Sequence, residues 1–312
     1  MDKSVVDNDE LLQSALQGLG LPQKRLDSKW FYDHRGSELF EEITQLPEYY
    51  PTRTETAILR EHVGALAKYV PQDGALFELG SGASVKTRIL LDDFDHIAAY
   101  LPSDISAEFL GGVARDLVRD YPDLDVVPVV ADFMGAMALP AQYADMPKAV
   151  FFPGSTIGNL EAEGAVELLS RVRMMPGVRA FILGADLVKD TGELIAAYDD
   201  AQGVTAAFNL NVLRRLNAEC GADFDLTAFA HEARWNQAHS RIEMHLVSRL
   251  EQTVVMGGEA IRFAAGESIH TENSHKYTQD RLAAMAARGG WRLVEFITDR
   301  QARFSVSVLI PV

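Results

Sequence analysis

The sequence is poor in cysteine, in long apolar runs and in basic charge. Its single cysteine, Cys220, excludes an intramolecular disulfide and a cysteine zinc cluster. No apolar run approaches the roughly 20 residues that a membrane-spanning helix needs. The stretch 1–20 lacks the basic start and continuous apolar core of a signal peptide. We therefore expect a cytosolic (cytoplasmic) protein that does not bind membranes.

The shortage of basic residues also limits the class of partner. With 45 Asp and Glu against 29 Lys and Arg the formal net charge is -16, which disfavours non-specific attraction to nucleic acid or anionic lipid. A small-molecule partner fits better. The 8 histidines are scattered, and none of them forms the H-E-x-x-H pattern of a zinc helix. We therefore expect no metal site.

The rest of the composition is that of an ordinary globular protein, with 47% hydrophobic and 24% charged residues among 312. From residue 54 onwards short β-rich runs alternate with helical periodicity, which predicts an α/β fold with a parallel sheet covered by helices. The expected strands are 75–79, 97–101, 126–131, 149–152 and 180–185, and the expected helices include 54–70, capped by Thr54, and 164–175.

This alternation stops between Leu187 and Tyr277, where the pattern is mixed. Beyond that insertion a helix is expected at 280–290, followed by strands at 291–297 and 304–312. The last two runs are close enough to form a hairpin.

A glycine turn follows the first expected strand, in "FELGSGASVKTRILL" (77–91). Gly80 and Gly82 allow a ligand to approach the backbone closely, and the next helix offers its positive N-terminus. In a doubly wound sheet such a turn lies at the ligand-binding switch point. The full G-x-G-x-x-G of dinucleotide sites is absent, which disfavours NAD. A purely structural turn is the other alternative.

Acidic residues follow the next two expected strands. Asp104 comes after the second, in "YLPSDIS", and Asp132 with Phe133 comes after the third, in "VVADF". An acid at the first of these places can hold both ribose hydroxyls. An acid followed by an aromatic ring can bond to an adenine and stack on it. Together with the glycine turn, these residues favour S-adenosylmethionine (SAM) as the ligand.

Several longer stretches carry a resemblance to a known family. From about residue 27 the chain resembles the histidine Nα-methyltransferases of ergothioneine biosynthesis, in "FYDHRGSELFEEITQLPEYYPTRTE", "ELGSGASVKTR", "PGSTIGNL", "GADLVKD", "AYDDAQGVTAAFN" and "TENSHKY". The resemblance implies a class I methyltransferase domain with a Rossmann-like sheet at 54–188 and 277–312. It also implies a second, substrate-binding domain, formed by the N-terminal segment 1–53 and the insertion 189–276.

The resemblance further implies a reaction. Such enzymes methylate the α-amino group of L-histidine three times to give hercynine, using SAM and no metal. We expect a monomer whose small-molecule substrates are L-histidine and its mono- and dimethylated forms. Two alternatives stay open: an N-methyltransferase of another aromatic amino acid, such as a tryptophan derivative, and a non-catalytic SAM-binding sensor.

The resemblance also implies roles for single residues. The cofactor-binding residues would be Gly80, Gly82, Lys86, Asp104, Asp132 and Phe133. Asn159 and Tyr198 match a pair that binds the substrate carboxylate, and Gly154 and Thr156 precede Asn159 in "PGSTIGNL". Aromatic rings beside the amine would be Phe40 and Tyr32, the latter a candidate catalytic proton relay. The residues around the imidazole would be Tyr49, Met244, Glu272 and Ser274.

Structural alternatives exist for the imidazole residues. Tyr49 could simply pack around the turn at Pro51, and Met244 could belong to the core. Glu272 and Ser274 could lie on a solvated edge. Because neighbouring residues of a strand face opposite ways, we expect Asn273 and His275 to point away from the substrate.

Overall fold

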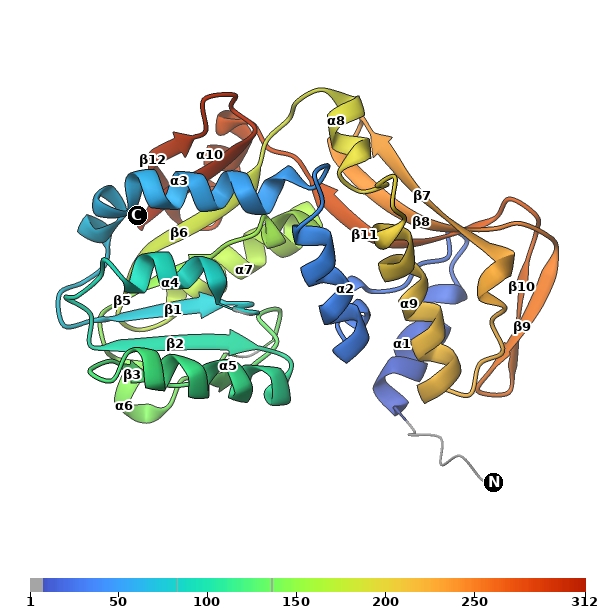
Figure 1. Cartoon of the computed structure of the whole chain (residues 1–312), viewed down its shortest axis with the longest axis horizontal. Coiled ribbons are helices and arrows are strands. Elements are labelled where there is room, and N and C mark those ends of the chain that lie inside the picture. Colours follow the sequence, from blue (N-terminus) through green and yellow to red (C-terminus); the bar gives the residue numbers. More distant parts are fainter. Residues whose placement is uncertain (1–7, 83, 136) are drawn as a thin grey trace. The chain divides into compact units, whose positions relative to one another are not determined.

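The computed structural model describes residues 8–82, 84–135 and 137–312, which form two compact units. Unit 1 combines the segment that ends at Tyr50 with Lys189–Ser274, and unit 2 combines Pro51–Val188 with His275–Val312. Each unit is therefore built from two segments that are distant in the sequence (Figure 1). Among the described residues, no helix is both long and apolar enough to cross a membrane.

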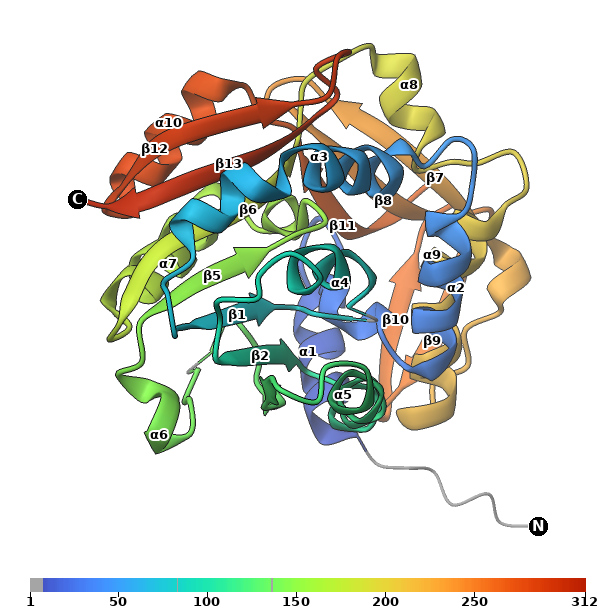
Figure 2. The same ribbon diagram turned by 60° about the vertical axis from the view of Figure 1, so that its left-hand side comes forward.

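Unit 2 contains a mostly parallel sheet. Its strands are β1 (Ala75–Leu79), β2 (Ala99–Asp104), β3 (Asp125–Val126), β4 (Val129–Val130), β5 (Lys148–Phe152), β6 (Val178–Asp186), β12 (Trp291–Thr298) and β13 (Phe304–Pro311). They follow the order β12-β13-β6-β5-β1-β2-β3, with β4 also paired to β2. Strands β2, β1, β5 and β6 are parallel (Figure 2), and β13 is antiparallel to β6 and β12. The expected parallel sheet and closing hairpin are confirmed.

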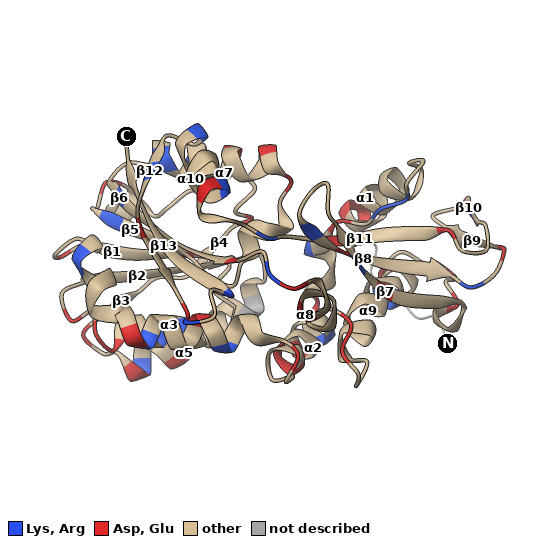
Figure 3. Ribbon diagram, turned by 90° about the horizontal axis from the view of Figure 1, so that it is seen from above, with Lys and Arg blue, Asp and Glu red and all other residues tan. Residues whose placement is uncertain are grey.

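Helices cover both faces of this sheet. They are α3 (Tyr50–Leu66), α4 (Val85–Leu91), α5 (Ala107–Asp120), α6 (Ala141–Ala144), α7 (Ala162–Met174) and α10 (Gln279–Arg288). Figure 3 shows α7 and α10 on one side of the sheet and α3 and α5 on the other. Phe77 packs in the core beneath α7 and α10, and its neighbour Leu76 packs in the core beneath α3 to α5. Because both faces are buried, the central strands are continuous apolar runs.

Unit 1 pairs helices with antiparallel strands. Its elements are α1 (Asp9–Leu19), α2 (His34–Thr44), α8 (Thr191–Ala196), α9 (Val204–Glu219), β7 (Phe229–Asn236), β8 (Arg241–Ser248), β9 (Gln252–Met256), β10 (Glu259–Phe263) and β11 (Ser268–His275). One sheet has the order β11-β8-β7, and β9 and β10 form a separate antiparallel pair. Helices and strands share one core, which includes Leu11, Leu39, Phe208 and Leu246. The mixed pattern of the insertion is therefore two helices followed by strands.

Some local expectations were wrong. Helix α3 begins at Tyr50, so Thr54 lies inside the helix and does not cap it. The run 126–131 is not one strand, because Pro128 separates β3 from β4 and a proline cannot donate to a strand ladder. The chain passes from one unit to the other after residues 50, 188 and 274, and the boundaries expected from the resemblance are 53/54, 188/189 and 276/277.

Candidate functional site

The glycine turn after β1 leaves the backbone open to a ligand. Gly80 and Gly82 have φ of +65° and +49°, values at which a side chain would be strained. A Cβ on Gly82 would meet no heavy atom within 4 Å. Strand β1 lies between β2 and β5, where the chain changes direction across the sheet, so this turn occupies the switch point.

Asp104 is the last residue of β2 and reaches the same turn. Its half-buried carboxylate accepts hydrogen bonds from Gly82 N (3.2 Å) and from Ser106 N (3.0 Å). A carboxylate has about four lone-pair sites, so it can accept further hydrogen bonds from a pair of hydroxyls. The next side chain, Ile105, is 41% exposed although it is large and apolar.

Asp132 and Phe133 lie in the loop that follows β4. The exposed Asp132 carboxylate accepts a hydrogen bond from Met134 N (2.8 Å). The ring of Phe133 packs edge-on against Phe152, and its Cε1 lies 3.8 Å from a Cβ built on Gly80. The structure thus brings the glycine turn, Asp104 and Phe133 to one edge of the sheet. Their donors, acceptors and aromatic ring suit a nucleoside, so they fit the adenosine of SAM.

Lys86 and Gly154 meet at a carboxylate that the sequence analysis did not select. Lys86 Nζ lies 2.5 Å from Oε2 of Glu55, a fully buried residue of α3. Gly154 N donates to the same carboxylate, at 3.1 and 2.9 Å from its two oxygens. In the sequence, Glu55 could have been noticed as an acidic residue at the end of the stretch "YYPTRTE", which carries part of the family resemblance.

The loop that carries Thr156 and Asn159 is fixed by contacts within unit 2. Both residues lie on a short 3-10 helix, Thr156–Asn159, directly after the strained Ser155 (φ +58°). The Ser155 hydroxyl accepts a hydrogen bond from Asp186 N (2.9 Å). The Asp186 carboxylate forms a fully buried ion pair with Lys276 (2.8 Å). The end of β6 and the chain beyond β11 therefore hold the loop in place.

In unit 1 the predicted aromatic substrate residues form a continuous chain. Ring centroids lie 5.8 Å apart for Tyr32 and Phe40, 6.2 Å for Phe40 and Tyr49, and 6.1 Å for Tyr49 and Tyr198, all edge-on. The Tyr198 hydroxyl lies 2.7 Å from the Ser274 hydroxyl. Residues from three stretches of sequence are thus brought together.

A further aromatic residue joins this chain. The ring of Phe208, on α9, lies 5.7 Å from that of Tyr32 and 6.0 Å from that of Phe40. The sequence analysis missed it, although it stands in the matched stretch "AYDDAQGVTAAFN". Met244 is 1% exposed and belongs to the unit 1 core, whereas Glu272 is half-buried on β11. The assignment of Met244 and Glu272 to the substrate stays a prediction.

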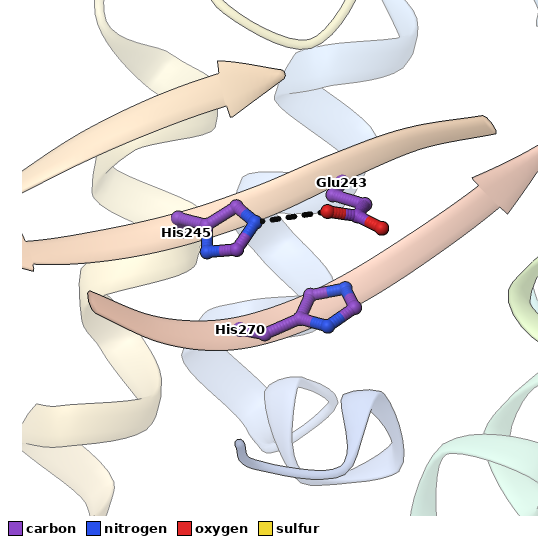
Figure 4. A group of neighbouring side chains, drawn as sticks. All are labelled: Glu243, His245 and His270. Carbon is purple, nitrogen blue, oxygen red and sulfur yellow. Dashed lines mark hydrogen bonds and ion pairs between the residues drawn. The ribbon is translucent and has the colours of Figure 1, made fainter. Parts of the chain in front are cut away.

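A histidine-rich group lies on β8 and β11. Glu243, His245 and His270 offer ligand atoms that are all within 4.8 Å of one another (Figure 4). Its members come from two strands, so they do not show the H-E-x-x-H spacing of a zinc helix in the sequence. His245 Nε2 lies 3.2 Å from Glu243 Oε2, and the two histidine rings stack at 4.9 Å with an angle of 15°.

This geometry does not favour a metal ion. A metal binds a histidine in the plane of its ring, and two rings stacked 4.9 Å apart with only 15° between their planes do not direct their nitrogens at one nearby point. The Glu243 carboxylate already pairs with Arg241 at 2.7 Å. Burial lowers the pKa of His245 to about 4. Burial alone would raise the pKa of Glu243, but hydrogen bonds from Arg241, Asn236 and His245 bring it down to about 2. His245 is therefore a neutral histidine beside a paired carboxylate.

Comparison with known proteins places the chain in a family. A model described as histidine-specific methyltransferase, SAM-dependent, matches residues 11–311. The histidine N-alpha-methyltransferase of Mycolicibacterium smegmatis is 42% identical over 309 residues, covering 97% of this chain and 95% of that protein. That of Mycobacterium tuberculosis is 41% identical over 309 residues, covering 96% and 94%. Ergothioneine biosynthesis protein 1 of Neurospora crassa is 28% identical over 283 residues, covering 86% of this chain and 31% of that protein. The chain therefore belongs to the SAM-dependent, histidine-specific methyltransferase family, and its unit 2 sheet is the Rossmann-like sheet of class I methyltransferases.

Proposed function

We propose that this enzyme transfers three methyl groups from SAM to the α-amino group of L-histidine, giving hercynine in the first step of ergothioneine biosynthesis. Membership of the family supports the reaction class. Two relatives that match almost their full length are histidine N-alpha-methyltransferases, which supports histidine as the substrate. A third relative is an ergothioneine biosynthesis protein, which supports the pathway.

The cofactor roles follow from the edge of the unit 2 sheet. SAM supplies an electrophilic methyl group carried by a sulfonium. In this proposal Asp104 accepts hydrogen bonds from the ribose, and Asp132 and Phe133 hold the adenine by a hydrogen bond and by ring contact. Gly80 and Gly82 allow the backbone to approach the ligand, and Lys86 presents its ammonium to it.

The substrate roles follow from the aromatic chain and the loop after β5. Asn159, Tyr198 and the loop residues Gly154 and Thr156 bind the histidine carboxylate in this proposal, by neutral donors that put no cation beside the reacting amine. Tyr32 and Phe40 present their ring faces to the amino group, because a ring face attracts a cation without a hydrogen bond that methylation would break. Tyr49, Met244, Glu272 and Ser274 surround the imidazole.

Catalysis in this proposal is mainly alignment. Holding the amine in line with the bond that breaks supplies most of the acceleration. The amine must attack in its neutral form, so a proton has to leave it before each transfer. Water takes that proton, either directly or through the Tyr32 hydroxyl, which accepts it on its oxygen and passes its own proton on to water.

The observation that carries the proposal is the contiguous set Tyr32, Phe40, Tyr49, Tyr198 and Ser274 in a chain of this family. The test is mass spectrometry after incubation with histidine and methyl-labelled SAM. We expect histidine carrying three labelled methyl groups, with little release of the mono- and dimethylated forms. Turnover of tryptophan but not of histidine would point to another aromatic amine, and binding without any turnover would point to a sensor.

The proposal includes a monomer that acts in the cytoplasm. Light scattering of the purified protein with histidine and SAM tests the first point, and fractionation of the source cells tests the second.

A further inference from the structure

Glu55 is a buried carboxylate that connects two of the matched stretches. It lies on α3, is 0% exposed, and has Lys86 Nζ at 2.5 Å from Oε2. The same group accepts the Gly154 backbone amide, at 3.1 Å to Oε1 and 2.9 Å to Oε2. It thereby joins the first turn of α4, after the glycine turn, to the start of the loop that carries Thr156 and Asn159.

The surroundings of Glu55 are shaped to hold this carboxylate in one place. Gly184 on β6 faces it, and a Cβ there would lie 2.0 Å from Glu55 Oε1 and 3.3 Å from Gly154 N. Lys86 is also largely covered, with a side-chain exposure of 17%. Any side chain at position 184 would therefore displace the carboxylate.

Stability alone is a weak reason for such a pair. Removing two charges from water costs several kcal/mol per ion before their attraction offsets it, and an apolar replacement of similar volume is often as stable. What a buried, doubly bonded carboxylate does provide is a fixed position for its partners. A lysine ammonium has three donors, so Lys86 can bond to Glu55 and still present protons to a ligand.

We propose that Glu55 is a positioning residue for methyl transfer: it fixes the Lys86 ammonium and the Gly154 amide relative to each other, and so sets the cofactor and substrate-carboxylate loops in register. This inference rests on the proposed function, because that function assigns Lys86 to the cofactor and the loop to the substrate. Glu55 itself touches neither ligand in this scheme.

The test changes the carboxylate in two independent ways. Glu55→Gln keeps the size of the side chain and an acceptor for Gly154 N but removes the charge that faces Lys86. Gly184→Ala removes no charged group, but its added methyl group displaces the Glu55 carboxylate. Gly64→Ala is the control, since Gly64 is an exposed residue of the same helix α3 with no atom within 4 Å of its added Cβ.

Two ligand constants are measured for each variant, below the lowest melting temperature of the set. They are the Kd for S-adenosylhomocysteine by calorimetry and the KM for histidine. We expect both Glu55→Gln and Gly184→Ala to weaken S-adenosylhomocysteine about tenfold and to raise the KM for histidine at least threefold, as for loss of a charge-assisted hydrogen bond. Gly64→Ala should match the wild type. A merely structural role would lower the melting temperature and leave both constants unchanged.

The outcomes separate this inference from the proposed function. If the wild type binds S-adenosylhomocysteine but does not methylate histidine, the proposed function fails. The ratio of the variant's Kd for S-adenosylhomocysteine to that of the wild type then decides the role of Glu55. If the wild type does not bind S-adenosylhomocysteine, both fail. Constants within twofold of wild type in either folded variant overturn the role of Glu55. If Glu55→Gln does not fold, Gly184→Ala decides the question.

Discussion

At the scale of single residues, the strand-end acid Asp104 has a structural role beside the ligand-binding role proposed for it. Asp104 already orders the turn by accepting Gly82 N and Ser106 N. Its replacement by alanine would leave two amides without an acceptor and so disturb the turn as well as the ligand. A conservative change is therefore the more informative one.

We predict that Asp104→Asn weakens the binding of SAM about tenfold while the melting temperature stays within a few degrees of wild type. Gly82 N and Ser106 N donate to different oxygens of Asp104, so the single amide oxygen of asparagine keeps one of these two bonds, whereas the charge-assisted bonds to two hydroxyls are lost. Calorimetry with SAM measures the first quantity and thermal unfolding the second. An unchanged Kd would mean that another acid holds the ribose.

In the proposed substrate site, Glu272 is the residue expected to recognise the imidazole. If its carboxylate accepts a hydrogen bond from the imidazole, Glu272→Ala removes a contact worth roughly 1.5 to 3 kcal/mol, so kcat/KM for histidine falls about tenfold to hundredfold. In this hypothesis the indole of tryptophan, with its single N–H, is not placed to make this bond, so tryptophan should gain relative activity, more so when Met244→Val adds room.

The control for Glu272 is the ratio of kcat/KM for histidine to kcat/KM for tryptophan. Specificity constants for histidine and tryptophan are compared in the wild type, both single variants and the double variant. A ratio that stays within about threefold of wild type, or less than roughly 0.7 kcal/mol, would remove Glu272 from the substrate site.

At the scale of elements, β8 and β11 carry a polar network beside the apolar core. Ile242, Met244 and Leu246 of β8 belong to that core, whereas the residues between them, Glu243 and His245, bond to polar groups. His245 Nδ1 lies 3.1 Å from the Ser268 hydroxyl, which ties β8 to β11. Alternation along one strand thus separates the two environments.

This network should make the protein sensitive to acid. Burial lowers the pKa of His245 from 6.5 to about 4. The unfolded chain therefore takes up a proton near pH 6.5 that the folded chain resists until about pH 4, so stability is lost as the pH falls through this window. At 1.36 kcal/mol per pKa unit, His245 accounts for about 3 kcal/mol over the whole window and about 2 kcal/mol between pH 7 and pH 5.

Urea unfolding at pH 7 and pH 5 measures this loss. We expect the wild type to lose about 2 kcal/mol more than His245→Gln between these two pH values. Glu243, with its pKa lowered to about 2, is ionised in the folded protein at both pH values and is present in both proteins, so it does not account for the difference between them. Parallel pH dependence in the two proteins would contradict the buried, neutral state of His245.

At the scale of the whole molecule, the insertion interrupts the sequence of unit 2, and the residues on either side of the insertion lie next to each other. Val188 N donates to Tyr277 O at 3.0 Å, and Leu187 and Tyr277 form a parallel bridge. The chain therefore leaves unit 2 and returns to it at neighbouring positions. The two cores of unit 2 consist of its own side chains, among them Phe77, Leu168 and Trp291.

We predict that unit 2 folds when the insertion is replaced by a short Gly/Ser linker between Val188 and His275 and the segment before Pro51 is removed. Termini that lie close together tolerate such joining. The shortened protein should unfold cooperatively and bind S-adenosylhomocysteine, but should not methylate histidine. The matched comparison is a version without residues 275–312, which lacks the antiparallel partner of β6 and should aggregate. A soluble, cooperative unit 2 that does not bind the nucleoside would show that its edge residues are not sufficient.

The sequence by itself determined the elements with local signals. Buried strands such as 75–79 are short apolar runs, and the turn after them needs residues that tolerate positive φ. The acids Asp104 and Asp132 stood out in the sequence because each lies at or just beyond the end of such a strand. Family likeness over long stretches supplied the reaction and most of the candidate residues, since those stretches are contiguous in the sequence.

Only the tertiary structure decided which distant residues meet. Glu55, Lys86, Gly154 and Gly184 come from four separate elements, and no period in the sequence connects them. The same holds for Phe208 in the aromatic chain and for His245 beside His270. The physical reason is that local conformation depends on neighbours along the chain, whereas charge pairing and ring packing depend on neighbours in space, which the packing of helices and strands sets.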